Sequence, residues 1–170
     1  MRIAITGTPG VGKSALAAQA EAQGHTVVAV GAWAREIGAV AGRDDADDAD
    51  VLDLDILAAH VTDTPADCFF DGHLSHLLPL DAAWVIRCDP LVLRQRLAAR
   101  GYAAAKVDEN VEAEAIDLIL QEALAHQARV VQRDGTQRSP QELWSAFAGT
   151  GLRRLKGTDL EPVDWSDRLL

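Results

Sequence analysis

The chain has 170 residues and a mass of 18.2 kDa, which is the size of one domain. Hydrophobic residues make up 48% of the sequence and charged residues 25%, a globular composition that excludes a disordered chain. The formal net charge of −10 argues against general coating of DNA, because neutralising phosphates needs clustered lysine and arginine. We therefore expect no direct sequence-specific nucleic acid binding. A small phosphate ligand held by a few well-placed groups is not excluded.

The two cysteines, Cys68 and Cys88, lie in apolar runs and have neither disulfide nor metal-type spacing. We expect both to be small buried hydrophobic residues. No apolar stretch approaches the roughly 20 residues of a membrane span, and the segment from Met1 to Ile5 has no signal-peptide pattern. These features predict a soluble, cytoplasmic protein with no membrane partner.

Apolar and β-branched runs predict strands at residues 3–6, 26–30, 68–70, 83–88 and 130–132. A glycine-rich turn and an alanine-rich segment separate the first two runs, and this is the βαβ signature of a parallel sheet. Helices are predicted at residues 13–22, 32–40, 55–61, 90–100 and 109–127, and a capping box predicts another from residue 139. The acidic run at 43–50 is predicted to be a solvated loop, and residues 151–170 an irregular tail.

The segment from Gly7 to Ser14, GTPGVGKS, matches the phosphate-loop pattern G-x-x-x-x-G-K-[ST] in full. Glycines allow backbone angles that let successive N–H groups converge on phosphate oxygens, and the following helix adds the positive end of its dipole. We expect Lys13 to reach the β- and γ-phosphates and the Ser14 hydroxyl to ligate Mg²⁺. The alternative is a glycine turn without phosphate, but the flanking strand and helix favour the phosphate loop.

The segment Asp71-Gly72-His73 directly follows the third predicted strand. In phosphate-loop proteins an acid at the end of a neighbouring strand helps to hold Mg²⁺, so Asp71 is a candidate metal ligand. His73 is a candidate for orienting an attacking group or moving a proton near neutral pH. The alternatives are a turn-forming aspartate and a packed or capping histidine. His60 and His76 belong to no motif and are predicted to be structural.

Basic residues surround Gly101 near the end of a predicted helix, namely Arg94, Arg96, Arg100 and Lys106. This pattern suits a lid that closes over phosphates and removes water during phosphoryl transfer. Arg100 stands at the predicted hinge and is the strongest candidate. For Arg94 and Arg96, the alternative interpretation is that they are solvated helix residues.

Three segments together resemble the adenylate kinase isoenzyme 6 family: Gly7 to Ser14, Asp71 to Pro79, and the run from Arg100 to Glu114. The Asp-x-His and Arg-Gly-Tyr motifs, in this order after a phosphate loop, are more specific than the loop alone. The resemblance covers residues 1 to about 148. It implies an α/β fold of the phosphate-loop nucleoside monophosphate kinase type, a five-stranded parallel sheet flanked by helices. The kinase domain would span 1–150, with a monophosphate-binding segment at about 28–51, a short lid at about 99–109 and a C-terminal tail at 151–170.

The resemblance also implies roles for individual residues. The ATP-binding residues would be Gly10, Val11, Gly12, Lys13, Ser14, Ala15 and Arg100. The catalytic residues would be Lys13, Asp71, His73 and Arg100, and the Mg²⁺ ligands Ser14 and Asp71. Arg35 would bind the AMP phosphate, because a guanidinium can make two parallel hydrogen bonds to it.

The activity implied by the resemblance is transfer of the ATP γ-phosphate to AMP or another nucleoside monophosphate, with Mg²⁺ and an accompanying ATPase activity. The family has a eukaryotic branch that acts in small ribosomal subunit maturation and rRNA processing. Two alternatives stay open. One is an ATPase assembly factor that transiently binds ribosomal protein uS11 and pre-small-subunit particles, since an acidic surface suits a basic partner. The other is a small-molecule phosphate-loop kinase of the shikimate or gluconate type, which should lack the Asp-x-His and Arg-Gly-Tyr motifs.

Overall fold

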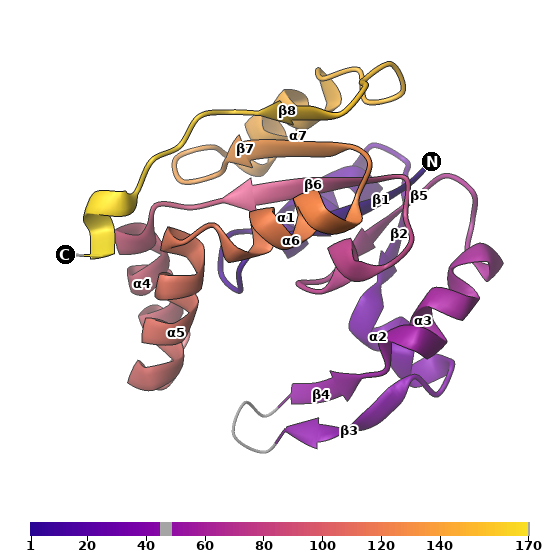
Figure 1. The fold of residues 1–170 in the computed structure, drawn as a ribbon, viewed down its shortest axis with the longest axis horizontal. Coiled ribbons are helices and arrows are strands. Elements are labelled where there is room, and N and C mark those ends of the chain that lie inside the picture. The colour runs from indigo at the N-terminus through magenta and orange to yellow at the C-terminus, as the bar shows by residue number, and fades with distance from the viewer. Residues whose placement is uncertain (45–48, 170) are drawn as a thin grey trace.

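The structure is a computed structural model that describes residues 1–44 and 49–169. At its centre lies a parallel sheet with the strand order β2-β5-β1-β6-β7-β8 (Figure 1). Its strands are β1 (Arg2–Thr6), β2 (Thr26–Ala29), β5 (Cys68–Asp71), β6 (Ala82–Arg87), β7 (Val130–Asp134) and β8 (Thr158–Leu160). Helices flank this sheet, so the expected α/β class is confirmed.

The sheet has six strands, one more than the five predicted. The sixth, β8, comes from the segment predicted to be an irregular tail and pairs in parallel with β7, with Val130 opposite Thr158. The run Thr158-Asp159-Leu160 does not alternate between apolar and polar residues, so the sequence gives no strand signal there. Thr158 and Leu160 are both exposed in the structure. Arg133 of β7 holds the strand by donating to the Asp159 carboxylate at 2.5 Å. A contact between distant segments therefore creates this strand.

The helices are α1 (Lys13–Ala22), α2 (Val30–Glu36), α3 (Leu54–His60), α4 (Pro90–Ala99), α5 (Ala104–Ala115), α6 (Leu118–His126) and α7 (Pro140–Ala148). Short 3-10 turns are η1 (Val61–Asp63), η2 (Ser75–Leu77) and η3 (Ser166–Leu169). Two predicted caps are present: the Asp89 carboxylate accepts from the Leu91 N–H, and Ser139 forms a capping box with Glu142. Across the described ranges, no helix has the length and apolarity to cross a membrane. Both cysteines are buried and free, as expected.

The long helix predicted at 109–127 is wrong, because the chain breaks there into α5 and α6. Asp117 lies at the break with φ 61, a left-handed conformation that is uncommon outside glycine. Its carboxylate accepts a hydrogen bond from Arg87 Nη2 at 2.5 Å. This contact with a buried guanidinium compensates for the unfavourable backbone angle.

A second, two-stranded antiparallel sheet contains β3 (Val40–Asp44) and β4 (Ala49–Leu52). The prediction of a loop at 43–50 is therefore wrong in part, because Arg43 pairs with Asp50 and Asp44 with Ala49 in this sheet. The rest of that acidic run, residues 45–48, lies outside the described residues. In Figure 1 this hairpin projects from the main sheet beside α2 and α3. The predicted helix at 32–40 corresponds to α2, which begins and ends earlier.

Alternating side chains divide the core between the two faces of the sheet. Ile5 of β1 packs in one cluster with Leu16 of α1 and Phe147 of α7. Its neighbour Ala4 points to the other face, where it packs with Leu120 of α6. β1 therefore lies buried between two layers, with β5 and β6 as its neighbours. Ligands of open α/β sheets bind at the carboxyl ends of such central strands.

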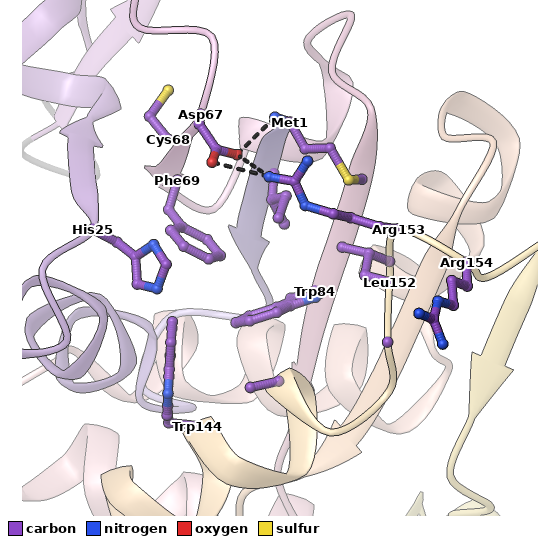
Figure 2. Close-up of a pocket in the computed structure, with 13 residues that line it drawn as sticks. Met1, His25, Asp67, Cys68, Phe69, Trp84, Trp144, Leu152, Arg153 and Arg154 are labelled. Carbon is purple, nitrogen blue, oxygen red and sulfur yellow. Dashed lines mark hydrogen bonds and ion pairs between the residues drawn. The ribbon is translucent and has the colours of Figure 1, made fainter.

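Leu152 fastens the segment after α7 to the main core, where it is 7% exposed (Figure 2). We predict that Leu152→Ala lowers the free energy of unfolding by about 2 kcal/mol, through lost burial and a new void. Leu160→Ala is the matched control, because Leu160 is 38% exposed and should cost less than about 1 kcal/mol. Urea denaturation measures both. Equal losses would show that Leu152 does not anchor this segment.

Candidate active site

The phosphate-loop motif connects the carboxyl end of β1 to α1. Gly10 and Gly12 have φ angles of 95° and 114°, in the region that favours glycine. A Cβ on Gly10 would lie 2.8 Å from the Leu93 Cδ1 atom of α4, so this glycine also permits close packing. These glycines therefore determine both the curvature of the loop and its close packing against α4.

Lys13 extends back across the loop, where its ammonium donates to the Gly7 carbonyl at 2.8 Å and the Thr8 carbonyl at 3.0 Å. Desolvation lowers the pKa of Lys13 to about 8, against the opposing effect of the Asp71 and Glu114 carboxylates. A buried ammonium that has lost its hydration is strongly stabilised by a new anionic partner. Lys13 is thus placed and poised to bind phosphate oxygens.

Asp71 ends β5, which pairs with β1 so that Ile5 lies opposite Asp71. The half-buried carboxylate faces the Ser14 side chain and Lys13. Burial raises the pKa of Asp71, while Lys13 and the hydrogen bond from Ser14 act in the opposite direction. A hydroxyl and a carboxylate are oxygen ligands that suit Mg²⁺, which usually takes one or two carboxylates together with substrate phosphates. The Ser14–Asp71 pair fits that role.

A cavity of about 560 Å³ lies over the loop, within the roughly 300–1,000 Å³ typical of ligand pockets. It collects most of the site residues predicted from the sequence: Gly10, Gly12, Lys13, Ser14, Ala15, His73 and Arg100. Helix α5 adds residues to which the sequence analysis assigned no individual role, among them Glu109, Asn110 and Ala113. Lys106 of the predicted lid also lines this cavity. Asp71 does not line the cavity but interacts with Lys13 and Ser14, which do.

A smaller cavity of about 200 Å³ adjoins the first and shares Arg100, Gly10, Gly12 and Ala15 with it. Val11 lines this smaller cavity, with Arg96, Arg138, Pro140 and Leu143 on its other sides. Arg96 is held there, because its Nη2 donates to the Thr136 carbonyl at 2.8 Å. Arg94 instead forms an exposed ion pair with Asp108. Of the arginines in and near the predicted lid, Arg100 is therefore the one that lines both cavities.

Arg35 lines neither of these two cavities. Its Nε lies 2.6 Å from Asp50 Oδ2, and its side chain is 66% exposed. Ala49, the neighbour of Asp50, does line the large cavity, so the β3–β4 hairpin reaches the site while Arg35 is paired at its edge. A phosphate that binds Arg35 has to compete with the Asp50 carboxylate.

The two histidines near β5 differ in environment. His73 lines the large cavity, and desolvation together with the Lys13 charge lowers the pKa of this imidazole. It is therefore neutral near pH 7 and can accept a proton. His76 is buried, with Nδ1 2.8 Å from the Thr6 hydroxyl and Nε2 3.1 Å from Glu122. As expected, His76 is a packed, hydrogen-bonded residue.

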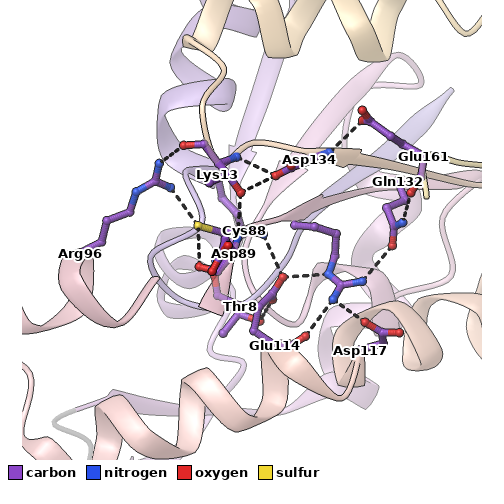
Figure 3. A network of polar contacts seen from close by, with 12 residues as sticks. Thr8, Lys13, Cys88, Asp89, Arg96, Glu114, Asp117, Gln132, Asp134 and Glu161 are labelled. Atoms are coloured by element: carbon purple, nitrogen blue, oxygen red, sulfur yellow. Dashed lines mark hydrogen bonds and ion pairs between the residues drawn. The ribbon is translucent and has the colours of Figure 1, made fainter. Parts of the chain in front are cut away.

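A buried polar network supports the loop from behind (Figure 3). Glu114 of α5 accepts from the Thr8 hydroxyl at 2.5 Å, from Arg87 Nε at 2.8 Å and from the Cys88 N–H at 3.0 Å. Sequence analysis missed this network. Its one local signal is Arg87, a charge inside an apolar strand that needs a buried partner.

The network continues into the C-terminal segment. Arg87 Nη1 donates to Gln132 at 3.0 Å, and Gln132 donates in turn to the Glu161 carbonyl at 2.5 Å. The Arg87 guanidinium also lies 4.9 Å from the centre of the Trp165 ring, a cation–π contact. The phosphate loop, β6 and the last residues of the chain are therefore linked by one set of contacts. Fold and site together define a phosphate-loop nucleotide kinase.

Known proteins agree with this class. A family model described as an AAA domain matches residues 3–117. A protein of Archaeoglobus fulgidus is 42% identical over 146 residues, which cover 86% of this chain and 79% of the relative. A protein of Pyrococcus abyssi is 40% identical over 173 residues, 98% and 92% of the two chains. A protein of Natronomonas pharaonis is 41% identical over 149 residues, which cover 86% of this chain and 88% of the relative. Each is named "Putative adenylate kinase". The chain belongs to this archaeal adenylate kinase family, as the resemblance indicated.

We predict that Glu114→Gln lowers the free energy of unfolding by about 3 kcal/mol, because it removes the buried charged partner of Arg87 and leaves its guanidinium only the partly exposed Asp117 carboxylate. The matched control is Asp108→Asn, which breaks the exposed Arg94–Asp108 pair and should cost less than about 1 kcal/mol. Adding Arg87→Met to Glu114→Gln should recover part of the loss. The prediction fails if urea denaturation gives the two single variants the same stability.

We predict that ATP binding takes up a proton above pH 8, because the free Lys13 amine is partly neutral there while phosphate favours the ammonium. Affinity for ATP should fall as pH rises through this value, by up to about tenfold per pH unit. Calorimetric titration at about pH 8.5, in two buffers of different ionisation enthalpy, measures the uptake. Lys156→Met should keep the uptake and Lys13→Met should lose it. Equal heats in both buffers for the unaltered protein would contradict the contact.

Proposed function

We propose that the protein is an adenylate kinase that transfers the γ-phosphate of ATP to AMP, using Mg²⁺. The nucleotide kinase class rests on the fold and on the family. The observation that carries the finer assignment is the large cavity, where Lys13 and Ser14 of the phosphate loop share one space with Arg100 of the lid segment, and Ser14 is in turn hydrogen-bonded to Asp71. Such an arrangement positions a phosphoryl donor and stabilises charge on the transferred group.

The donor side is built from the loop and the lid arginine. ATP phosphates would lie along the N–H groups of Gly10 to Ala15, with Lys13 on the transferred group. Ser14 and Asp71 would hold Mg²⁺, which supplies neutralisation of phosphate charge when bound. Because Arg100 faces both cavities, the nucleoside would extend into the smaller one.

The acceptor side is the segment at about 28–51. Its β3–β4 hairpin reaches the large cavity through Ala49. We assign Arg35 to the AMP phosphate, although it is paired with Asp50 in this structure. A phosphate dianion offers more acceptor oxygens and charge than one carboxylate, so it can displace Asp50 from the guanidinium. The Arg35–Asp50 pair would then re-form when product leaves.

The lid segment at about 99–109 includes the turn at Gly101, with φ 79, and the first turns of α5. Arg100 and Lys106 of this segment face the cavity. Closure of these residues over both nucleotides would exclude water from the transferred phosphoryl group. AMP would then be favoured over water as the acceptor.

The second candidate is an ATPase acting in the cytoplasm on small ribosomal subunit maturation and rRNA processing. The observation that favours it is His73, a neutral imidazole on the cavity wall that can accept a proton from water. The net charge of −10 suits a basic partner such as ribosomal protein uS11 on pre-small-subunit particles. The two activities share one phosphate loop and differ in the acceptor.

We predict that ADP forms rapidly only when AMP accompanies ATP and Mg²⁺, with slower phosphate release in its absence. Arg35→Gln should raise the KM for AMP by about tenfold or more with a smaller change in kcat, since it removes a charged phosphate contact. Arg154→Gln, an exposed arginine elsewhere, is the matched control and should change neither constant. Lys13→Met should abolish both reactions.

His73→Ala separates the two candidates in the same assay. It should slow phosphate release from ATP more than transfer to AMP, because only water needs a base on the cavity wall. Equal loss of both rates would reject this division of labour. AMP-independent phosphate release as the main activity would reject the kinase in favour of the ATPase.

A further inference from the structure

A separate cavity of about 380 Å³ lies at the end of the sheet opposite the phosphate loop. Ile3 near the start of β1 lines it, as do Phe69 near the start of β5 and Trp144 of α7 (Figure 2). No residue of the phosphate loop lines it. Its volume falls within the roughly 300–1,000 Å³ of small-molecule sites.

The walls of this cavity are mainly aromatic and hold one another in place. The ring centre of Phe69 lies 4.9 Å from that of Trp84 and 5.6 Å from that of Trp144. Trp84 is also stacked on Phe147 at 4.8 Å, so its ring is fixed from behind. Such walls offer flat apolar surfaces at little cost in side-chain entropy, which suits a flat aromatic ligand.

The mouth of the cavity is basic, although the whole chain has a net charge of −10. The Asp67 carboxylate there is already engaged, by the Met1 ammonium at 2.8 Å and by Arg153 at 3.0 Å. Arg154 also lines the mouth, and the described residues provide it with no ion pair. One cation is therefore available beside the aromatic walls.

The wall also contains a hydrogen-bond donor without a partner. Trp84 is 3% exposed, and its indole Nε1 is buried with no acceptor in the part of the chain that the structure describes. A buried donor of this kind is unfavourable. Because this nitrogen is closed off from solvent, a molecule in the cavity would contact the carbon atoms of the Trp84 ring and not this donor.

We propose that this cavity binds a small organic anion with a flat aromatic body. The body would lie against Phe69, Trp84 and Trp144, and the anionic group would face Arg154 at the mouth. Because the cavity and the phosphate loop are at opposite ends of β1, such a ligand and ATP would bind at the same time. The site is independent of the kinase assignment.

The test uses 8-anilinonaphthalene-1-sulfonate as the anionic probe and N-phenyl-1-naphthylamine as its uncharged counterpart, with fluorescence on the full chain. We expect the sulfonate to bind at one site per chain and to remain bound when ATP and Mg²⁺ are saturating. Release of the probe by ATP would place it on the phosphate loop and overturn the proposal. Equal affinity for both probes would overturn the anionic preference.

Variants locate the bound probe. Ala148 is exposed at the end of α7 and lines the cavity. Ala148→Trp should therefore obstruct the cavity and lower the affinity for the sulfonate probe by at least about tenfold. Arg154→Gln should lower the affinity for the sulfonate probe by about threefold, the effect expected for losing one exposed charge contact. It should leave the affinity for the uncharged probe unchanged. Lys156→Gln removes a nearby charge outside the cavity and should have no effect.

The two kinds of variant protect the test from a folding artefact. Arg154 is an exposed side chain without an ion pair among the described residues, so its loss should leave the melting temperature unchanged. If Arg154→Gln and Lys156→Gln weaken the sulfonate equally, the effect is general charge and the proposed site is wrong. Unaltered affinity in a folded Ala148→Trp chain would likewise exclude this cavity.

Discussion

The buried ion pair between Arg87 and Glu114 is the contact on which the arrangement of the site depends. Both side chains are 2% exposed, and Arg87 Nε lies 2.8 Å from Glu114 Oε1. A guanidinium removed from water is stable only with well-placed partners, so β6 fixes where the end of α5 lies. The other oxygen of Glu114 accepts from the Thr8 hydroxyl at 2.5 Å. The same pair therefore holds the sheet, the phosphate loop and α5 in one geometry.

Helix α5 consequently has one anchored end and one end at the cavity. The anchored end carries Glu114, and Asp117 just beyond it also accepts from Arg87. The other end begins after the turn at Gly101 and carries Lys106, which lines the cavity. Val107 in these first turns is buried in the main core together with Leu93 and Leu97 of α4. Movement of the first turns toward the phosphates would therefore require α4 and α5 to move together.

The features that the sequence predicts correctly have local signals. Glycine spacing defines the phosphate loop, and a four-residue motif defines the capping box at Ser139. The break at Asp117 depends instead on Arg87, 30 residues away, and β8 exists because β7 offers it an edge. Arg87 is recognisable as a charge within an apolar strand, but only the fold identifies Glu114 as its partner. The Arg35–Asp50 pair is likewise a contact made by folding, which motif spacing does not encode.

The electrostatics of the site follow from burial more than from the number of charges. Among the described residues, the cations that line the large cavity are Lys13, Arg100 and Lys106, and Lys106 lies 3.0 Å from the Glu109 carboxylate. In a chain of net charge −10, long-range attraction for an anionic nucleotide is weak, because exposed charges are screened within about 10 Å at 0.1 M salt. Lys13 escapes that screening, and its lowered pKa is the sign that it has lost water. Affinity for phosphate then depends on contact within the loop, so salt should affect the rate of nucleotide encounter more than the stability of the complex once formed.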